Sequence, residues 1–224
     1  LLILLHFMNN SILIQDTEVL IFNPYLNKSN INHIVVFLHG YGANSKDLFF
    51  INKIKPFDNS LNIYPQGFIK LDNQFTTDSF CWGEFSNPNK YNDQMDESAE
   101  KIKKLIFEAK KKITNSENIK ISIVGFSQGG MLAQILAFTK IHNVENLILL
   151  STMLPDFSES KFESKINNFF IGHGEYDEVI DIQSAVMMYN LYTKHGYTVN
   201  FNKYKTGHNI DYKLLEDISI YKFN

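Results

Sequence analysis

The chain has 224 residues, a formal net charge of −3 at pH 7 and 44% hydrophobic residues, which is enough for a domain with a sizeable apolar core that needs no disulfide or metal. All 21 basic residues are lysines, which excludes bidentate guanidinium recognition of phosphate or carboxylate. The small negative charge argues against general nucleic-acid binding, and the single cysteine, Cys81, excludes an intramolecular disulfide and a multi-cysteine metal site.

The N-terminal residues 1–7 form an apolar run that is far shorter than a membrane span. The run lacks the basic residues before it and the small residues after it that a secretory signal needs. We expect Met8 to be the natural start and residues 1–10 to be an N-terminal extension that need not be native; a weak membrane-touching tail is the alternative. We also expect a cytoplasmic protein with no stable membrane insertion.

Residues 11–22 are expected to form an antiparallel hairpin that turns near Asp16. After residue 31, apolar runs of strand length alternate with helical patterns. Several runs are uninterrupted, as in a parallel sheet that is buried on both faces: 34–38, 121–124, 147–150 and 169–171. In residues 197–204 apolar and polar side chains alternate, which predicts a half-exposed strand at a sheet edge.

Apolar residues spaced three to four apart predict helices over 95–113, 131–138 and 182–195. Asp93 or Asp96 is expected to cap the first of these helices.

Residues 65–93 fit neither periodicity and are interpreted as a long loop, which at that length is often functional. The order of elements predicts an α/β fold of three layers, with a mostly parallel central sheet and an N-terminal antiparallel hairpin. No repeat or low-complexity linker interrupts residues 11–224, which we expect to form a single domain.

The clearest functional motif is Gly125-Phe126-Ser127-Gln128-Gly129, between a predicted strand and a predicted helix. This is the G-x-S-x-G pattern in a strand–turn–helix context. A serine on so sharp a turn needs neighbours without colliding side chains, which the two flanking glycines provide, and a further glycine follows them at position 130. Ser127 is therefore the candidate nucleophile, at the carboxyl edge of the sheet, where α/β enzymes bind ligands.

A serine nucleophile needs a general base and an acid that orients the base, in the chain order Ser, Asp or Glu, His. Asp177 and His208 each follow a predicted strand, so they are expected on the same edge as Ser127. Asp156 also follows a strand and is the second choice for the acid, whereas His173 is a weaker candidate for the base.

Other titratable side chains have structural interpretations. Asp181 is expected to cap a helix and His195 to end one, whereas His33 and His142 are expected to be solvated.

The negative oxygen that forms during attack on a carbonyl needs two preorganised donors. The backbone N–H of Gln128, directly after the nucleophile, is one candidate. The N–H of Tyr41, in the glycine-rich segment that follows the strand at 34–38, is the other. The side chain of the neighbouring His39 is interpreted as structural.

Four segments resemble the phospholipase/carboxylesterase family of α/β-hydrolases, which includes acyl-protein thioesterases. They lie, in order, at 38–44, 125–130, 173–180 and 207–210, and Gly-Phe-Ser-Gln-Gly-Gly is the most specific of them. The resemblance implies an α/β-hydrolase fold, a triad of Ser127, Asp177 and His208, and an oxyanion hole made by the amides of Tyr41 and Gln128.

The chain departs from the family pattern in two loops. Ser45 stands where the family commonly has glycine, and Ile180-Asp181-Ile182 stands where the family has a proline shortly after the acid loop. Trp82 with Phe85 resembles the aromatic segment that lies beside the acyl site in the family; simple loop packing of Trp82 is the alternative.

We therefore expect a serine carboxylic-ester hydrolase that cleaves short- or medium-chain acyl esters or thioesters through an acyl-serine intermediate, without a metal or organic cofactor. Lysophospholipase or acyl-protein thioesterase activity is the alternative; a serine peptidase and a non-catalytic hydrolase-fold binding protein are more distant ones. The expected partners are a small-molecule ester or an acylated protein or lipid, and no nucleic acid. Exposed aromatic residues in the long loop could also pair two copies in a homodimer.

Overall fold

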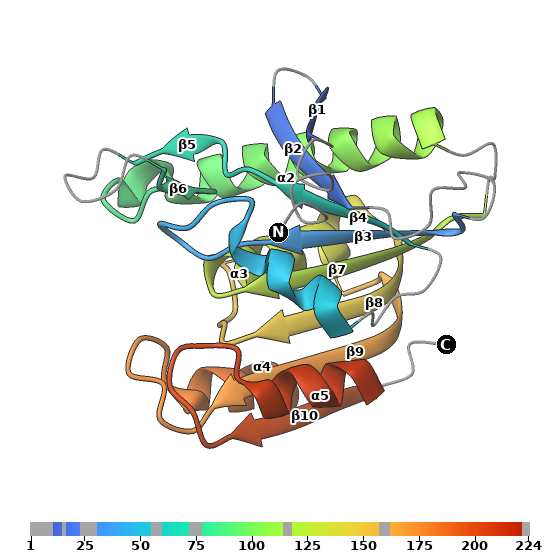
Figure 1. The fold of residues 1–224 in the computed structure, drawn as a ribbon. Coiled ribbons are helices and arrows are strands. Elements are labelled where there is room, and N and C mark those ends of the chain that lie inside the picture. Colours follow the sequence, from blue (N-terminus) through green and yellow to red (C-terminus); the bar gives the residue numbers. More distant parts are fainter. Residues whose placement is uncertain are drawn as a thin grey trace.

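The computed structural model describes the chain in these stretches: 11–14, 17–22, 31–54, 60–71, 78–113, 118–156 and 162–220. The predictions for the extension at 1–10 and for the turn at Asp16 concern residues outside these stretches. The described strands form an eight-stranded sheet in the order β1-β2-β4-β3-β7-β8-β9-β10 (Figure 1). Their bounds are β1 Ser11–Ile14, β2 Thr17–Phe22, β3 His33–Leu38, β4 Ser60–Pro65, β7 Lys120–Phe126, β8 Asn143–Leu150, β9 Lys165–Gly174 and β10 Val199–Tyr204.

The strands from β4 to β10 in this spatial order all run parallel to one another. The first two strands form an antiparallel hairpin, and β2 pairs antiparallel with β4. These pairings confirm the predicted α/β fold, the mostly parallel sheet and the N-terminal hairpin. At the other end of the order, β10 has β9 as its single neighbour among the described strands and is mostly half-buried, so the alternating pattern correctly predicted an edge strand.

Helices cover both faces of the sheet and make three layers (Figure 1). The side chains of β3 show the division, because Ile34, Val36 and Leu38 belong to one apolar cluster whereas Val35 and Phe37 belong to the other. On the first face lie α2 (Pro88–Ile113), α3 (Gln128–Ile135), its π-helical continuation η3 (Leu136–Lys140) and α4 (Ile182–Lys194); on the second lie the 3₁₀ helix η2 (Asp47–Ile54) and α5 (Tyr212–Ile220).

Two predictions on the segment 65–93 are wrong. The segment is not a loop throughout, because β5 (Ile69–Lys70) and β6 (Phe80–Cys81) pair as a small antiparallel sheet. Its last residues are already helical, because α2 begins at Pro88, where the fixed φ of proline suits a first helical turn. Asp93 and Asp96 therefore lie inside the helix and do not cap it.

Buried polar residues explain one further wrong prediction, that for His33, and one strand that was not predicted, β4. His33 is only 7% exposed, so the prediction that it is solvated is wrong; its Nε2 lies 2.7 Å from Ser122 Oγ. The strand β4 was not predicted because Ser60 and Asn62 interrupt its apolar pattern. Both are buried, and the Ser60 hydroxyl donates to Asn62 Oδ1 at 2.7 Å. The 3₁₀ helix η2 and the helix α5 were not predicted either.

Candidate active site

Ser127 lies on the sharp turn between β7 and α3 with a positive φ of 53°, a conformation that is strained for any residue other than glycine. The glycines around it are required by close backbone contacts. A Cβ on Gly125 would lie 2.3 Å from the carbonyl oxygen of Gly129, and a Cβ on Gly129 would lie 2.0 Å from that of Leu38. The motif therefore fixes the backbone so that the serine hydroxyl projects from the turn.

The end of β8 supports this turn. The Ser127 N–H donates to the Leu150 carbonyl at 3.0 Å, and the Thr152 hydroxyl donates to the Ser127 carbonyl at 2.7 Å. Between these two residues, Ser151 is also held at a positive φ, 44°. Thr152 further packs against Gly130, where a Cβ would lie 2.6 Å from the threonine Cβ. Sequence reasoning missed Thr152, because nothing in its local pattern shows that it meets the turn.

The structure brings the three triad candidates together. Ser127 Oγ lies 3.0 Å from His208 Nε2, and His208 Nδ1 lies 2.8 Å from Asp177 Oδ2. Because a carboxylate only accepts hydrogen bonds, Nδ1 carries the hydrogen and Nε2 is free to accept the serine proton. The side chain of Asp177 is fully buried, whereas that of His208 is 18% exposed and therefore open to a substrate.

The carboxylate of Asp177 is held on both of its oxygens. Besides the contact of Oδ2 with His208, Oδ1 accepts the backbone N–H groups of Val179 at 2.9 Å and of Ile180 at 2.8 Å. Amides that converge in this way hold the carboxylate in place and fix its direction. Hydrogen bonds to this side chain thus order the loop after β9.

The rival candidates occupy other positions. Asp156 is exposed and accepts a hydrogen bond from Asn92 Nδ2 at 3.0 Å. Asp181 caps α4 as predicted, because its carboxylate accepts the Gln183 N–H at 2.7 Å, and His195 lies at the end of that helix. His142 is exposed, as predicted.

His39 orders the segment that carries the Tyr41 amide. Its Nδ1 lies 2.8 Å from the Gly40 carbonyl, and its Nε2 accepts the Gly67 N–H at 3.0 Å. The hydrogen is therefore on Nδ1, and burial lowers the pKa of this histidine from 6.5 to about 4. Because the Gly40 carbonyl and the Tyr41 N–H belong to one peptide plane, the imidazole fixes the direction of that N–H.

Gln128 links the second proposed donor to the segment at 80–83. Its side-chain Oε1 accepts the Trp82 N–H at 3.0 Å, and its Nε2 donates to the Gly83 carbonyl at 2.6 Å. The Trp82 indole in turn donates to the His39 carbonyl at 2.8 Å. The two backbone segments proposed to hold the oxyanion are thus joined through Trp82.

The two acyl-site candidates have different surroundings. Trp82 is fully buried and engaged with His39, which favours the loop-packing alternative for this residue. Phe85 is 50% exposed; its ring stacks on Tyr91 at 5.0 Å between centroids and lies 4.8 Å from the ring of Tyr41. Phe85 therefore lies beside the segment of the proposed oxyanion donor, with half of its side chain open to solvent.

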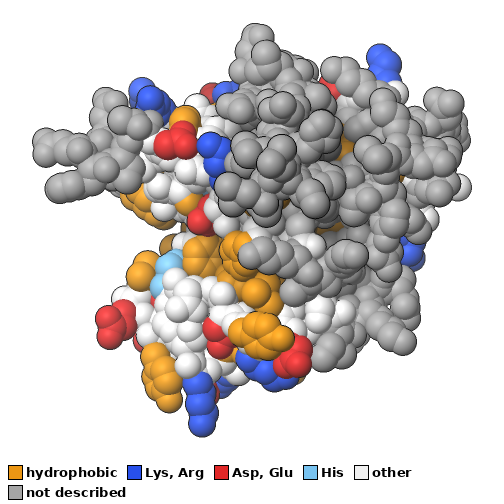
Figure 2. Space-filling view, viewed as in Figure 1, with side chains coloured by type: hydrophobic (Ala, Val, Ile, Leu, Met, Phe, Trp, Pro, Cys, Tyr) orange, Lys and Arg blue, Asp and Glu red, His pale blue; other side chains and the backbone are white. Residues whose placement is uncertain are grey.

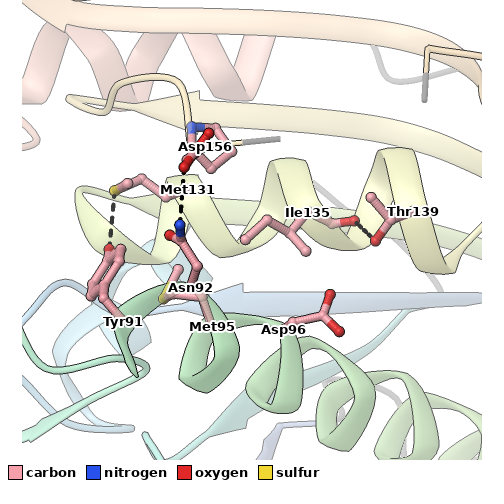
Figure 3. Close-up of a pocket in the computed structure, with 9 residues that line it drawn as sticks. Tyr91, Asn92, Met95, Asp96, Met131, Ile135, Thr139 and Asp156 are labelled. Carbon is pink, nitrogen blue, oxygen red and sulfur yellow. Dashed lines mark hydrogen bonds between the residues drawn. The ribbon is translucent and has the colours of Figure 1, made fainter. Parts of the chain in front are cut away.

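A pocket lies next to these aromatic residues, between α2 and the α3–η3 helix (Figure 3). Tyr91 and Met131 point toward one another at one end of it, with the Tyr91 hydroxyl 3.5 Å from the methionine sulfur. Met131 also donates its N–H to the Ser127 carbonyl at 3.3 Å, so this wall of the pocket begins at the nucleophile turn. The space-filling view looks onto the other face of the sheet, which carries η2 and α5, and shows hydrophobic side chains and a histidine around a notch at the edge of the molecule (Figure 2).

Within the stretches that the structure describes, no group of three or more His, Cys, Asp or Glu side chains is placed to hold a metal ion. Among the same residues, no helix is both long enough and apolar enough to cross a membrane.

Comparisons with known proteins agree with this architecture. A model of the phospholipase/carboxylesterase family matches residues 25–223. The carboxylesterase of Bacillus cereus has a similar structure, with a TM-score of 0.74 at 17% identity over 97% of each chain. Acyl-protein thioesterase 2 of Zea mays has a TM-score of 0.69 at 20% identity, over 90% of this chain and 95% of that chain. For a carboxylesterase of Mesorhizobium loti the TM-score is 0.72 at 18% identity, over 94% and 97% of the two chains. At these identities the similarity to the solved structures is one of fold.

Proposed function

Because this chain belongs to the phospholipase/carboxylesterase family of α/β-hydrolases and is a hydrolase, we propose that it cleaves short- or medium-chain carboxylic esters or thioesters with Ser127 as the nucleophile. The observation that carries the proposal is the continuous hydrogen-bonded series from Asp177 through His208 to the Ser127 hydroxyl. A neutral serine is a weak nucleophile, and this series supplies the base that activates it.

In the first half of the reaction, Ser127 Oγ attacks the carbonyl carbon of the acyl group while its proton moves to His208 Nε2. The buried carboxylate of Asp177 stabilises the imidazolium that forms. The N–H groups of Tyr41 and Gln128 hold the negative oxygen of the tetrahedral intermediate. His208 then gives its proton to the departing alcohol or thiol, and the acyl group stays on Ser127 as an ester.

In the second half, His208 takes a proton from a water molecule, whose oxygen attacks the acyl carbon. The proton then returns to Ser127 Oγ as the carboxylic acid leaves. Apart from the substrate and the water molecule, every group that this cycle uses belongs to the chain itself.

The acyl group is proposed to lie against the exposed ring of Phe85 beside Tyr41. Cleavage of an acylated protein or a lysophospholipid is the second candidate, because all these substrates present the same kind of carbonyl. The absence of arginine from the sequence favours simple esters and thioesters over a phosphate headgroup, which lysines or backbone amides would have to recognise.

Hydrolysis of p-nitrophenyl esters by the wild type and by Ser127→Ala tests the proposal. We expect the variant to be inactive and to escape labelling by a fluorophosphonate probe. Equal rates for the two proteins would contradict the assignment. A series of acyl chains from acetyl to palmitoyl, repeated with Phe85→Ala, tests the acyl contact: a flat profile for both proteins would exclude it.

We also propose a cytoplasmic location and a homodimer. The single cysteine, Cys81, is buried, and burial raises its pKa to about 12, so the chain is not suited to disulfide formation. The exposed Phe85 and Tyr41 offer apolar surface to a second copy. Sedimentation analysis of Phe85→Ala and the wild type tests the dimer.

A further inference from the structure

The strand that leads into the loop of Asp177 carries a histidine, His173, that the proposed reaction does not use. His173 lies near the end of β9, and its side chain is fully buried, as is that of Asp177. Its Nε2 lies 2.8 Å from the carbonyl oxygen of Ile180 and 3.5 Å from Asp177 Oδ2, the oxygen that faces His208. The acid of the proposed triad therefore has a histidine on each side.

The partners of this imidazole determine its tautomer. The Ile180 carbonyl can only accept a hydrogen bond, so Nε2 of His173 carries the hydrogen. Nδ1 is buried and has no hydrogen-bond partner among the described residues, so a second hydrogen there would be buried without an acceptor. Burial accordingly lowers the pKa of His173 and keeps the ring neutral. The neutral ring leaves His208 as the cation that Asp177 stabilises during the reaction.

Ile180 transmits the effect of His173 to the acid. Its N–H donates to Asp177 Oδ1 at 2.8 Å, and its carbonyl accepts the hydrogen bond from His173. The backbone is thus fixed on both sides of this residue, and the following residue, Asp181, is fixed by its role as the cap of α4. Without the bond to His173, the Ile180 carbonyl would lose its buried donor, and the amide that aims Oδ1 would be free to move.

We propose that His173 is a positioning residue of the hydrolase reaction: its Nε2–H holds the Ile180 carbonyl and thereby fixes the carboxylate of Asp177 against His208. This inference rests on the proposed function. It predicts that His173 acts on the chemical step through Asp177, without any contact to the substrate.

Two substitutions of His173 distinguish the effect of its hydrogen-bond donor from the effect of its side-chain volume. In His173→Gln, the amide nitrogen reaches the position of Nε2 and can still donate to Ile180, whereas His173→Met fills the space without a donor. We expect His173→Met to lower kcat by about 10- to 100-fold with little change in KM, because a displaced acid weakens only the step that charges His208. His173→Gln should restore kcat to within about threefold of the wild type, since the hydrogen bond is kept.

Rates are normalised to the active fraction, measured by titration with a fluorophosphonate, so that misfolded protein does not count as lost activity. His142→Met, at an exposed histidine, is the matched control and should behave as the wild type. If His173→Met does not fold, His173→Asn replaces it, because the shorter amide reaches only the position of Nδ1. Equal kcat values for the donating and the non-donating variant, or a loss confined to KM, would overturn the proposal.

A double-mutant cycle with Asp177→Asn tests the route of the effect. If His173 acts through Asp177, then adding His173→Met to Asp177→Asn lowers kcat by less than about twofold, because the effect is already lost. Fully additive losses would overturn the positioning role. Ser127→Ala in the same assay keeps the two proposals apart: an active Ser127→Ala variant contradicts the proposed function, whereas an inactive one with additive His173 effects contradicts this inference alone.

Discussion

Two serine–histidine pairs lie toward opposite ends of the same strand, β7. At the carboxyl end, Ser127 Oγ is 3.0 Å from His208 Nε2; toward the amino end, Ser122 Oγ is 2.7 Å from His33 Nε2. The second pair is the closer one, yet its surroundings suit it to structure and not to chemistry.

The two pairs differ in the solvent access of the serine, in its backbone conformation and in the third side chain that contacts the pair. Ser122 is fully buried in a regular strand, and its oxygen also accepts a hydrogen bond from Asn146 Nδ2 at 2.6 Å. Burial lowers the pKa of His33 from 6.5 to about 4, against the opposite effect of the Glu145 carboxylate, whereas His208 has the fully buried carboxylate of Asp177 2.8 Å from its Nδ1. A short serine–histidine distance therefore does not make a nucleophile. A reachable hydroxyl and a base oriented by a buried carboxylate are needed as well.

Removing each serine should separate the two pairs most sharply. We expect Ser127→Ala to lower kcat for p-nitrophenyl acetate by about 10⁴-fold or more, because it removes the atom that forms the acyl intermediate. Ser122→Ala should change kcat by less than about twofold while lowering the free energy of unfolding by about 1–3 kcal/mol, since His33 and Asn146 lose a buried partner. Steady-state kinetics and urea unfolding measure both quantities. Comparable losses of kcat would show that the comparison is mistaken.

The third partners of the two pairs, Asp177 and Asn146, should differ in the same way. The loss of kcat should be smaller than for Ser127→Ala. Asp177→Asn is expected to lower kcat by about 10³- to 10⁴-fold, because an amide cannot stabilise the imidazolium of His208. Asn146→Ala should leave kcat nearly unchanged and reduce only the free energy of unfolding, because Asn168 loses the acceptor that it contacts at 2.9 Å. An Asp177→Asn variant with wild-type kcat would remove the carboxylate from the proposed mechanism.

At acid pH the buried histidines should lower the free energy of unfolding. His33 and His39 both have a pKa of about 4 in the folded protein against a usual value of 6.5, so below pH 6.5 the unfolded chain binds protons that the folded chain does not. Their contribution is therefore fully present above pH 6.5 and is lost as the pH falls toward 4, by up to about 3 kcal/mol for each histidine. Urea unfolding at pH 7 and pH 4.5 measures this loss, and His33→Gln should make it smaller. The same pH dependence in the variant and the wild type would exclude His33 as a source.

The smallest expected effect concerns the support of the nucleophile turn. Thr152→Val removes the hydroxyl that donates to the Ser127 carbonyl and should lower kcat by about tenfold, whereas Thr152→Ser keeps the donor and should stay within about threefold of the wild type. Kinetics normalised to the active fraction distinguish the two variants. If Thr152→Ser loses activity and Thr152→Val does not, the packing of the threonine methyl on Gly130, and not the hydrogen bond, supports the turn.

Much of the fold and of the site follows from local sequence. The turn at Ser127 is predictable because Gly125 and Gly129 must lie at fixed offsets from it, and the edge placement of Asp177 and His208 follows from the strands that precede them. The contacts of Thr152, the burial of His33 and the pairing of Phe80 with Ala43 join residues that are distant in the sequence. No local periodicity encodes them, because the polar groups involved are satisfied only by partners that the completed fold supplies.

The contacts of Trp82 connect the two proposed oxyanion amides to each other. Trp82 connects His39 to Gln128, so the two proposed oxyanion amides come from segments that are brought into register only when a third segment closes over them. The nucleophile turn, by contrast, depends on contacts with the ends of the neighbouring strands β3 and β8. A change at Trp82 would therefore displace both proposed oxyanion amides at once and leave the nucleophile turn in place.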